Sequence, residues 1–288
     1  MNDQIAGIHN VSDTARWVAH FRALETRRPD ALFRDPYAER LAGERGFQIA
    51  KILAQGTEQG TSYGWAWVAR TCQFDSFVSR LLRDGADLVL NLAAGLDARP
   101  YRMELPSSLQ WVEVDLPEII SYKEEILAME SPRCRLERVA LDLSDIKGRR
   151  DLFQAMNARA QKITVLSEGL LVYFSPEEVA ALARDLACGL HFQSWIIDIS
   201  SAIQLASMQQ GTLGKYFGDS NVQFKFGPPE GVNFFKQNGW EPMEVKGLLE
   251  TAAQNNRAPQ EFLSLLPDPR PIPASYPWTG VCLLQKLE

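Results

Sequence analysis

The sequence predicts an α/β protein built on a doubly wound, mostly parallel sheet of seven strands, with an N-terminal helical cap and a lid insertion. From about residue 86 onward, short apolar runs alternate with amphipathic helical patterns. This alternation is typical of a parallel sheet with helices on both faces. The first apolar run ends in Ala93-Ala94-Gly95. Small residues suit the first strand-to-helix turn of such a sheet, where a ligand approaches the backbone.

Seven segments have the length and apolar character of strands. A proline-rich stretch, Pro259–Pro277, separates the last two of them, and this favours an antiparallel pair at one edge of the sheet. The expected strands are Leu88–Leu92, Gln110–Val114, Leu136–Leu141, Ile163–Ser167, Trp195–Ile199, Glu241–Val245 and Gly280–Lys286.

The helix Pro176–Leu190 has the best-marked start. Ser175 can cap it, Pro176 suits its first position, and Glu178 can complete a capping box. Its apolar residues then recur on one face. Another helix is expected to begin at Pro117. Three more are expected over Ser12–Arg27, Trp65–Leu82 and Gly231–Gln237.

Two regions differ in character. Residues 1–85 are mostly helical and are predicted to form a cap on the sheet, whereas residues 86–288 form the core. Within the core, residues 202–228 are long enough for a lid over an acceptor pocket. The side chains expected to line an apolar cavity there are Met208, Tyr216, Phe217 and Phe224, although core packing is the competing fate for most of them.

Composition excludes several classes of function. The net charge is −6 and no Lys/Arg block stands out, so a nucleic-acid partner is not expected. No apolar run approaches the length of a membrane span, and no signal peptide is visible, so a cytoplasmic protein is expected. The four cysteines and three histidines show no metal-binding spacing, which predicts no metal site.

Acidic residues end successive predicted strands. Asp115 closes the second strand, 20 residues after Gly95, and a carboxylate there can accept hydrogen bonds from both hydroxyls of a ribose. Asp142 ends the third strand, where it could accept from an adenine amino group, and Glu168 ends the fourth. The alternative for Asp115 and Asp142 is that each caps the following helix. For Glu168 it is an ordinary acid in solvent.

Five stretches of the sequence resemble one family of class I S-adenosylmethionine-dependent methyltransferases, which contains leucine carboxyl methyltransferases and bacterial polyketide O-methyltransferases. AAGLDARPYRM resembles its first-strand motif, VEVDLPEIISYK its second-strand block and SEGLLVYFSPEEV its fourth-strand block. SDTARWVAHFRALETRRPDALFRDPYA and RTCQFD resemble its N-terminal cap and its Arg-Thr helix. The resemblance implies a Rossmann-like methyltransferase fold with S-adenosyl-L-methionine as cofactor.

The resemblance also implies roles for single residues. Arg70 would hold the methionine carboxylate of the cofactor by bidentate hydrogen bonds, with Arg22 as a second basic residue. Gly95 would lie under the methionine and ribose, and Asp115 would take the ribose hydroxyls. The residues expected around the cofactor further include Ala93, Leu116, Asp142, Leu143 and Glu168.

Two positions depart from the family pattern. Its first glycine is Ala93 here, and its threonine after Asp97 is Ala98. Both changes bear on how the cofactor fits. The turn residues Arg99 and Arg102 are expected to fasten the loop by ion pairs.

The chemistry expected is in-line methyl transfer to an oxygen. No histidine stands in the cofactor motifs, which favours an acceptor that is already ionised, such as a carboxylic acid. Tyr173 and Glu168 are the candidate catalytic residues, because they are the polar groups expected nearest to the reaction, with Tyr173 orienting the acceptor. His20 and His191 are candidate bases if the fold brings them in.

The acceptor is expected to be a small molecule, with a polyketide or a carboxylic acid as the classes that the resemblance suggests. The alternatives are an NAD(P)-dependent oxidoreductase, since Gly95 and Asp115 also suit that cofactor, and a non-catalytic protein of the same fold. The sequence leaves open which molecule is methylated, whether oxygen or nitrogen receives the methyl group, and the oligomeric state.

Overall fold

The computed structural model describes residues 11–55, 64–211, 223–266 and 277–288. Its centre is a seven-stranded sheet in the order β3-β2-β1-β4-β5-β7-β6. The strands are β1 (Leu88–Leu92), β2 (Gln110–Asp115), β3 (Arg135–Ala140), β4 (Ile163–Ser167), β5 (Phe192–Ser200), β6 (Trp240–Gly247) and β7 (Thr279–Lys286).

Strand direction follows the prediction. β1 to β5 pair in parallel, whereas β7 runs antiparallel to both β5 and β6. The doubly wound, Rossmann-like fold class and the antiparallel pair at one edge are therefore confirmed. Every predicted strand is present, and the bounds of β1 and β4 agree to the residue.

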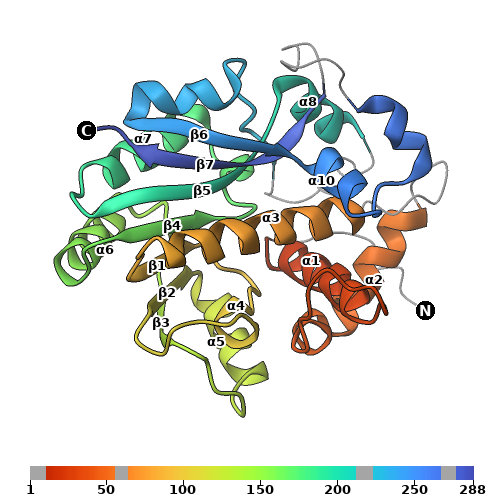
Figure 1. Cartoon of the computed structure of the whole chain (residues 1–288), viewed down its shortest axis with the longest axis horizontal. Coiled ribbons are helices and arrows are strands. Elements are labelled where there is room, and N and C mark those ends of the chain that lie inside the picture. Colours follow the sequence, from red (N-terminus) through yellow and green to blue (C-terminus); the bar gives the residue numbers. More distant parts are fainter. Residues whose placement is uncertain (1–10, 56–63, 212–222, 267–276) are drawn as a thin grey trace.

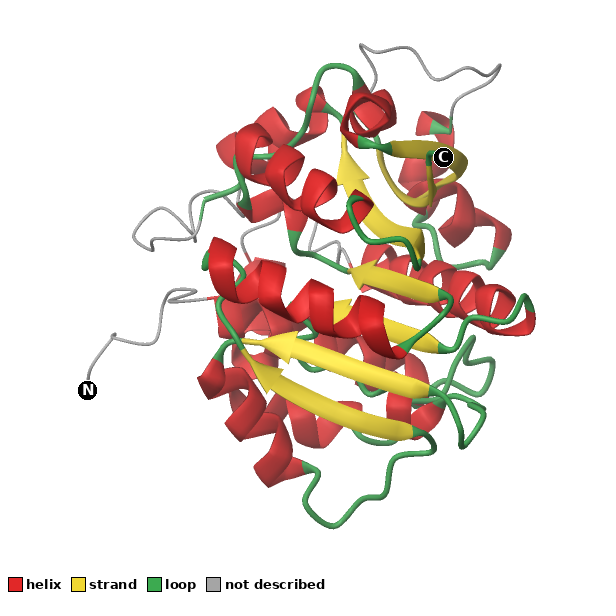
Figure 2. Ribbon diagram, turned by 90° about the vertical axis from the view of Figure 1, so that its left-hand side faces the viewer, coloured by secondary structure: helices red, strands yellow, loops and turns green. Residues whose placement is uncertain are grey.

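The helical elements lie on both sides of the sheet (Figure 1; Figure 2). The α-helices are α1 (Val11–Thr26), α2 (Ala38–Gln55), α3 (Gly64–Arg83), α4 (Arg99–Arg102), α5 (Pro117–Ile126), α6 (Ile146–Arg159), α7 (Pro176–Ala187), α8 (Ala202–Gln210) and α10 (Leu248–Gln254). The 3-10 helices are η1 (Leu171–Tyr173), η2 (Gly231–Asn238) and η3 (Gln260–Leu265).

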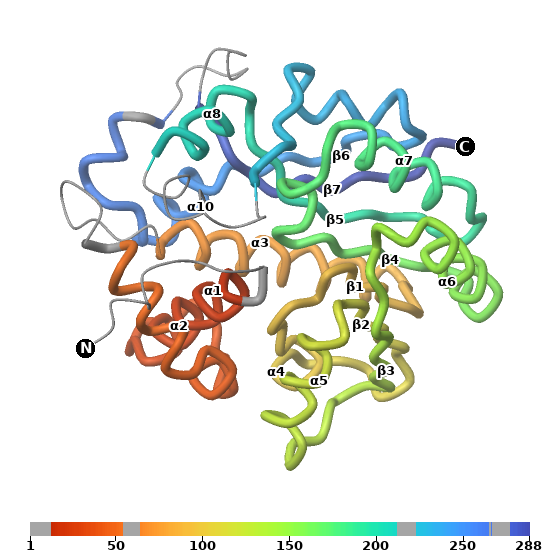
Figure 3. The backbone as a smooth tube through the Cα atoms, turned by 180° about the vertical axis from the view of Figure 1, so that it is seen from behind, coloured from red at the N-terminus to blue at the C-terminus, as the bar shows by residue number. Residues whose placement is uncertain are grey.

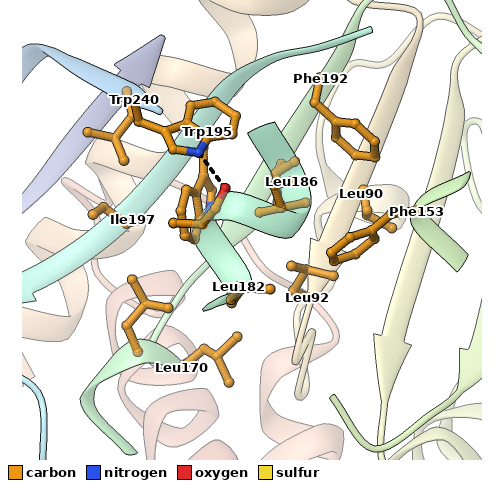
Figure 4. Packing of buried hydrophobic residues seen from close by; sticks show 14 of the residues in the cluster. Leu90, Leu92, Phe153, Leu170, Leu182, Leu186, Phe192, Trp195, Ile197 and Trp240 are labelled. Atoms are coloured by element: carbon orange, nitrogen blue, oxygen red, sulfur yellow. Dashed lines mark hydrogen bonds between the residues drawn. The ribbon is translucent and has the colours of Figure 1, made fainter. Parts of the chain in front are cut away.

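Alternate residues of each strand build two cores, one on each face of the sheet, because successive side chains of a strand point to opposite faces. In β1, Leu88, Leu90 and Leu92 pack with α6, α7 and η2, whereas Val89 packs with α3 and α10. Part of the first core is drawn in Figure 4. Trp195 of β5 belongs to this core and is fully buried.

The start of α7 has the predicted capping box. Ser175 Oγ accepts from the Glu178 N–H at 3.2 Å, and Glu178 Oε2 accepts from the Ser175 N–H at 2.7 Å. Gly231–Asn238 is a 3-10 helix rather than an α-helix, and Gly239 ends it in the left-handed region at φ +93°. Helix α7 ends at Ala187, three residues before the predicted end.

The three N-terminal helices pack against different parts of the molecule. Helix α3 packs on the sheet through Phe74, Phe77 and Leu81. Helices α1 and α2 pack on each other. They also pack against the turn after β1 and against α5. Figure 3 shows α1 and α2 at the same end of the molecule as α8 and α10. The grouping of residues 1–85 into one cap remains a prediction, and α3 packs as part of the core.

No helix in the described ranges has the length and hydropathy needed to cross a membrane.

Candidate active site at the carboxyl ends of the strands

A cavity of about 590 Å³ opens at the carboxyl ends of the parallel strands. Its lining comes from the ends of β1, β2, β4 and β5 and from α1, α3, α8 and α10. Strand order reverses beside β1, and ligands bind at this kind of switch point in doubly wound sheets. The volume lies in the range of about 300–1,000 Å³ that is usual for small-molecule sites.

The turn after β1 is fastened by Asp115. Gly95 N–H donates to Asp115 Oδ2 at 2.6 Å, and Leu116 N–H donates to Asp115 Oδ1 at 2.8 Å. Burial raises the pKa of Asp115, and these two backbone hydrogen bonds act against that rise. Leu116 is the N-cap residue of α5 and makes no side-chain cap bond, so Asp115 joins two strand ends instead of capping the helix.

The same turn places an alanine in the left-handed region. Ala93 has φ +51° and Gly95 has φ +49°. A residue other than glycine is destabilised by roughly 1 kcal/mol or more in this backbone conformation. A Cβ built on Gly95 has Ala15 Cβ at 3.5 Å as its one close neighbour among the described residues, so space for a ligand remains above this backbone.

Arg70 of α3 connects the ends of β4 and β5. Its Nε donates to Glu168 Oε1 at 3.1 Å, and its Nη1 donates to Asp198 Oδ2 at 2.9 Å. Asp198 Oδ1 accepts in turn from the Gly169 N–H at 2.7 Å. Burial lowers the pKa of Arg70, but the charges of Asp198 and Glu168 reverse this and leave the pKa above its usual value. The guanidinium is therefore a fixed charge facing the cavity.

Arg99 holds the other oxygen of Glu168. Its Nη1 donates to Glu168 Oε2 at 2.8 Å and to Asp97 Oδ2 at 3.0 Å, and its Nε donates to Asp75 Oδ1 at 2.6 Å. Arg102 also pairs with Asp75, through two donors at 2.7 Å. The two arginines thus fasten the loop, as the sequence led us to expect, and Glu168 has an arginine on each carboxylate oxygen.

Arg22 joins the helical cap to the turn. Its Nε donates to Asp35 Oδ2 at 2.9 Å, and its Nη2 donates to the Leu96 carbonyl at 2.5 Å. It lines the cavity but uses these donors within the protein.

Tyr173 lies at the end of η1, beside α1 and the segment before η2. Burial raises the pKa of its phenol, and a hydrogen bond with Thr14 and the charge of Arg70 act in the opposite direction. Its ring lies 5.8 Å from that of Phe224. With a raised pKa, Tyr173 stays protonated near neutral pH and serves as a hydrogen-bonding group rather than a base.

Most of the predicted site residues line this one cavity: Arg22, Arg70, Ala93, Gly95, Asp115, Glu168 and Tyr173. Three do not. Asp142 is exposed and accepts from the Ser144 N–H at 2.8 Å, within its own turn. The N-cap residue of α6 is Asp145, so the alternative that Asp142 caps this helix is wrong. Leu143 faces the core, and Leu116 lies outside the lining. Their part in cofactor binding stays a prediction.

Sequence reasoning missed Asp198 and Asp75. Asp198 lies within a run predicted as strand, so it did not register as a strand-end acid, and Asp75 is one acid among the polar residues of a helix. The lid residues Met208 and Phe224 do line the cavity, whereas Tyr216 and Phe217 lie outside the described residues. Of the candidate bases, His20 and His191 are absent from the lining.

Comparison with known proteins gives three findings. Residues 15–187 match the Leucine carboxyl methyltransferase family. A candidate S-adenosyl-L-methionine-dependent methyltransferase of Frankia alni is 29% identical over 278 residues, 89% of this chain and 92% of that protein. Another candidate of the same description, from Mycolicibacterium paratuberculosis, is 35% identical over 178 residues, 57% of this chain and 58% of that one.

Solved structures agree on the fold alone. A candidate methyltransferase of Thermobifida fusca has a TM-score of 0.62 at 13% identity, covering 99% of this chain and 96% of that chain. A DUF574 family protein of Streptomyces avermitilis has a TM-score of 0.61 at 14% identity, covering 95% and 97%.

The strain at Ala93 gives a first prediction. Ala93→Gly should raise the free energy of unfolding by roughly 0.5–1 kcal/mol, because relief of the left-handed strain exceeds the added entropy of the unfolded chain. The neighbouring Ala94→Gly is the matched control. Ala94 is buried and has no positive φ, so the same change there should lower stability by a similar amount. Urea denaturation of both variants measures this, and destabilisation by Ala93→Gly would refute the strain.

Asp97 makes stability depend on acid pH. Burial raises the pKa of its carboxyl, but the charge of Arg99, aided by Lys123 and Arg102, holds the pKa at about 2. The pKa of an aspartate in an unfolded chain is about 3.9. Ionised Asp97 therefore stabilises the folded protein above that pH, and this stabilisation is lost as the pH falls toward about 2.

Asp97→Asn should remove this contribution. Between pH 5.5 and pH 3, the wild type should lose about 1 kcal/mol more unfolding free energy than the variant does. Asp151→Asn, on the exposed face of α6, is the matched control. Urea denaturation at each pH gives the two slopes, and parallel slopes for wild type and Asp97→Asn would contradict the assignment.

Proposed function

Since the chain belongs to the leucine carboxyl methyltransferase family and is an S-adenosylmethionine-dependent methyltransferase, we propose that it methylates an oxygen of a small-molecule acid, in the first place a carboxylate. The observation that carries this proposal is the state of the polar groups around the cavity. These groups can hold and orient bound molecules, and no acid at the strand ends is free to remove a proton from an acceptor.

The acids at the strand ends are already engaged. Both oxygens of Glu168 accept from arginines, and both oxygens of Asp115 accept from backbone N–H groups. Tyr173 keeps its proton because of its raised pKa. Glu250 also lines the cavity, but a carboxylate is a weak base for a phenol, whose usual pKa is about six units higher. A carboxylic acid needs no base, because it is ionised near neutral pH.

The residues present fit the cofactor. A guanidinium has five N–H donors, and Arg70 uses two nitrogens within the described part of the chain, so donors remain for a carboxylate. Asp115 retains acceptor positions for ribose hydroxyls, since an ionised carboxylate offers about four. Open space above Gly95 allows close approach to the backbone. S-adenosylmethionine supplies an activated methyl group on a sulfonium, whose departure needs no acid catalyst.

The protein's own contribution is then positioning. Holding two reactants in line can supply roughly 7–11 kcal/mol of the barrier. Tyr173 and Thr14 lie on the side of the cavity that faces the helical cap, where a phenolic O–H can donate to an acceptor carboxylate. We assign Tyr173 this orienting role, and Glu168 a positioning role through Arg70 and Arg99. This assignment replaces direct catalysis by Glu168, whose oxygens are both occupied.

Methyl transfer to matched acceptors tests the proposal. A panel of aromatic acids, with 2-naphthoic acid, 2-naphthol and 2-naphthylamine as one matched set, should give methyl esters, with little ether and no methylated amine. Alkaline hydrolysis releases a labelled methyl group from an ester as methanol, so the product class is read directly. The rate constant kcat should stay flat between pH 6 and pH 8, because no base titrates there.

Transfer mainly to the phenol or the amine, or a kcat that rises through neutral pH, would contradict carboxylate methylation. Binding of NADH without binding of S-adenosylhomocysteine would contradict the cofactor itself.

A further inference from the structure

Helix α8 turns one face toward the cavity. Its residues in the lining are Gln204, Ser207 and Met208, and its C-cap residue Gly211 lines the cavity as well. These positions are three and four apart, which places them on one side of an α-helix. The helix contains no buried residue, so each of these side chains keeps accessible surface.

This face of α8 is polar and uncharged, and it points toward the end of β5. The helix contains no acidic or basic residue. Met208 gives the direction of the face, because its Sδ lies 4.0 Å from Ser200 Oγ. Gln204 lies one turn before Met208, and its half-buried amide is accessible and makes no hydrogen bond with any described residue. An amide supplies both donors and an acceptor, so Gln204 can pair with a ligand group in either sense.

Two hydroxyl groups lie on the sheet side of the same space. Ser200 of β5 and Thr279 of β7 are paired across the sheet, line the cavity and have their hydroxyl oxygens 2.9 Å apart. Two hydroxyls carry two protons, and the hydrogen bond between them uses one. The other side-chain contact described for the pair is with the Met208 thioether, which is a weak acceptor. A ligand oxygen would accept the remaining proton better.

The cavity is divided by charge. Its four lining arginines come from α1, α3 and α4: Arg22, Arg70, Arg99 and Arg102. No lysine in the described ranges lines it. The elements around α8 add two acids to the lining, Asp198 of β5 and Glu250 of α10, and Asp198 is already paired with Arg70. A second carboxylate on a ligand would therefore lack a cation at α8 and lie on the side of two acids, which is unfavourable.

Apolar side chains connect α8 with Tyr173, the residue that is proposed to orient the acceptor. Met208 and Phe224 belong to the same apolar cluster as Tyr173, and the rings of Phe224 and Tyr173 lie 5.8 Å apart. Trp17 and Trp67 also belong to this cluster and line the cavity. An acceptor that extends from Tyr173 toward α8 thus passes mainly apolar and aromatic walls, and these suit an aromatic body.

We propose that Gln204, Ser200 and Thr279 form a subsite for an uncharged hydroxyl group on the body of the acceptor. This proposal rests on the carboxylate methylation proposed above, and it narrows the substrate class to hydroxylated aromatic carboxylic acids. A hydroxyl group both donates and accepts, as the three side chains do, so it can pair with them in full. A hydrocarbon in the same place leaves these groups without the ligand's hydrogen bonds.

A matched set of acids isolates this requirement. 2-Naphthoic acid and its 5-, 6- and 7-hydroxy derivatives share one ring frame and one carboxyl group, and the hydroxyl reaches a different point in each. The protein is first saturated with S-adenosylhomocysteine, and each acid is then titrated by calorimetry. The best hydroxy acid should bind about three- to tenfold more tightly than 2-naphthoic acid, since a hydrogen bond between neutral groups is commonly worth a factor of this size. Naphthalene-2,6-dicarboxylic acid should bind more weakly than 2-naphthoic acid.

Variants assign the preference to the subsite. Gln204→Met keeps the length of the side chain and removes the amide, and Thr279→Val keeps its shape and removes the hydroxyl. Each should reduce the affinity ratio between the best hydroxy acid and 2-naphthoic acid at least twofold, whereas a merely structural role would weaken both acids equally and leave the ratio unchanged. Gln210→Met is the matched control, because Gln210 is exposed on the same helix and lies outside the cavity lining. It should leave the ratio as it is in the wild type.

Methyl transfer to the same acids separates the two proposals. Formation of the methyl ester of 2-naphthoic acid with no preference for any hydroxy acid would overturn the subsite and leave the function intact. A preference that survives in both Gln204→Met and Thr279→Val, or tighter binding of the dicarboxylic acid, would overturn the subsite as well. Absence of ester from every acid of the set would overturn the function, and the subsite with it.

Discussion

The bridge from Arg70 to Glu168 and Asp198 is the constraint on which the site depends. It is a buried cation between two partly buried acids, and it joins α3 to the ends of β4 and β5. Charges of this kind are costly to remove from water and are retained only where partners compensate them closely. Loss of one partner leaves an unpaired buried charge, so the members of the cluster are expected to tolerate substitution poorly.

The local backbone is shaped around this bridge. Gly169 has φ +70°, and a Cβ there would lie 3.2 Å from Arg70 Nη1. Both the backbone conformation and the lack of space therefore favour glycine at this position. Arg99 then binds the second oxygen of Glu168 and connects the bridge to the turn after β1. The polar floor of the cavity is therefore one connected network. Such a network fixes positions well and exchanges protons poorly, and this suits a reaction whose methyl donor is already activated.

The sequence predicted the framework well because local rules and tertiary packing agree there. The β1 and β4 runs are apolar and bounded by turn residues, and Ser175 with Glu178 satisfied a capping rule that needs no tertiary information. The 20-residue spacing from Gly95 to Asp115 was also informative, since both residues meet in the fold.

Prediction was weaker where roles depend on which groups meet across the sheet. Asp142 looked equivalent to Asp115 by pattern, yet it bonds within its own turn. Asp198 lies inside a strand pattern and joins the site only because β5 lies next to β4 and near α3.

The most direct measurement of the central claim compares two ligands on two variants. S-adenosylhomocysteine carries the amino-acid carboxylate, and 5′-methylthioadenosine lacks it. Arg70→Lys keeps the charge but loses the planar fork of donors, and Arg80→Lys, on the same helix but outside the cavity, is its control. Calorimetry should show S-adenosylhomocysteine binding weakened roughly tenfold by Arg70→Lys alone, with 5′-methylthioadenosine binding unchanged in both variants. Equal weakening of both ligands by Arg70→Lys, or unchanged binding of S-adenosylhomocysteine, would contradict the role given to Arg70.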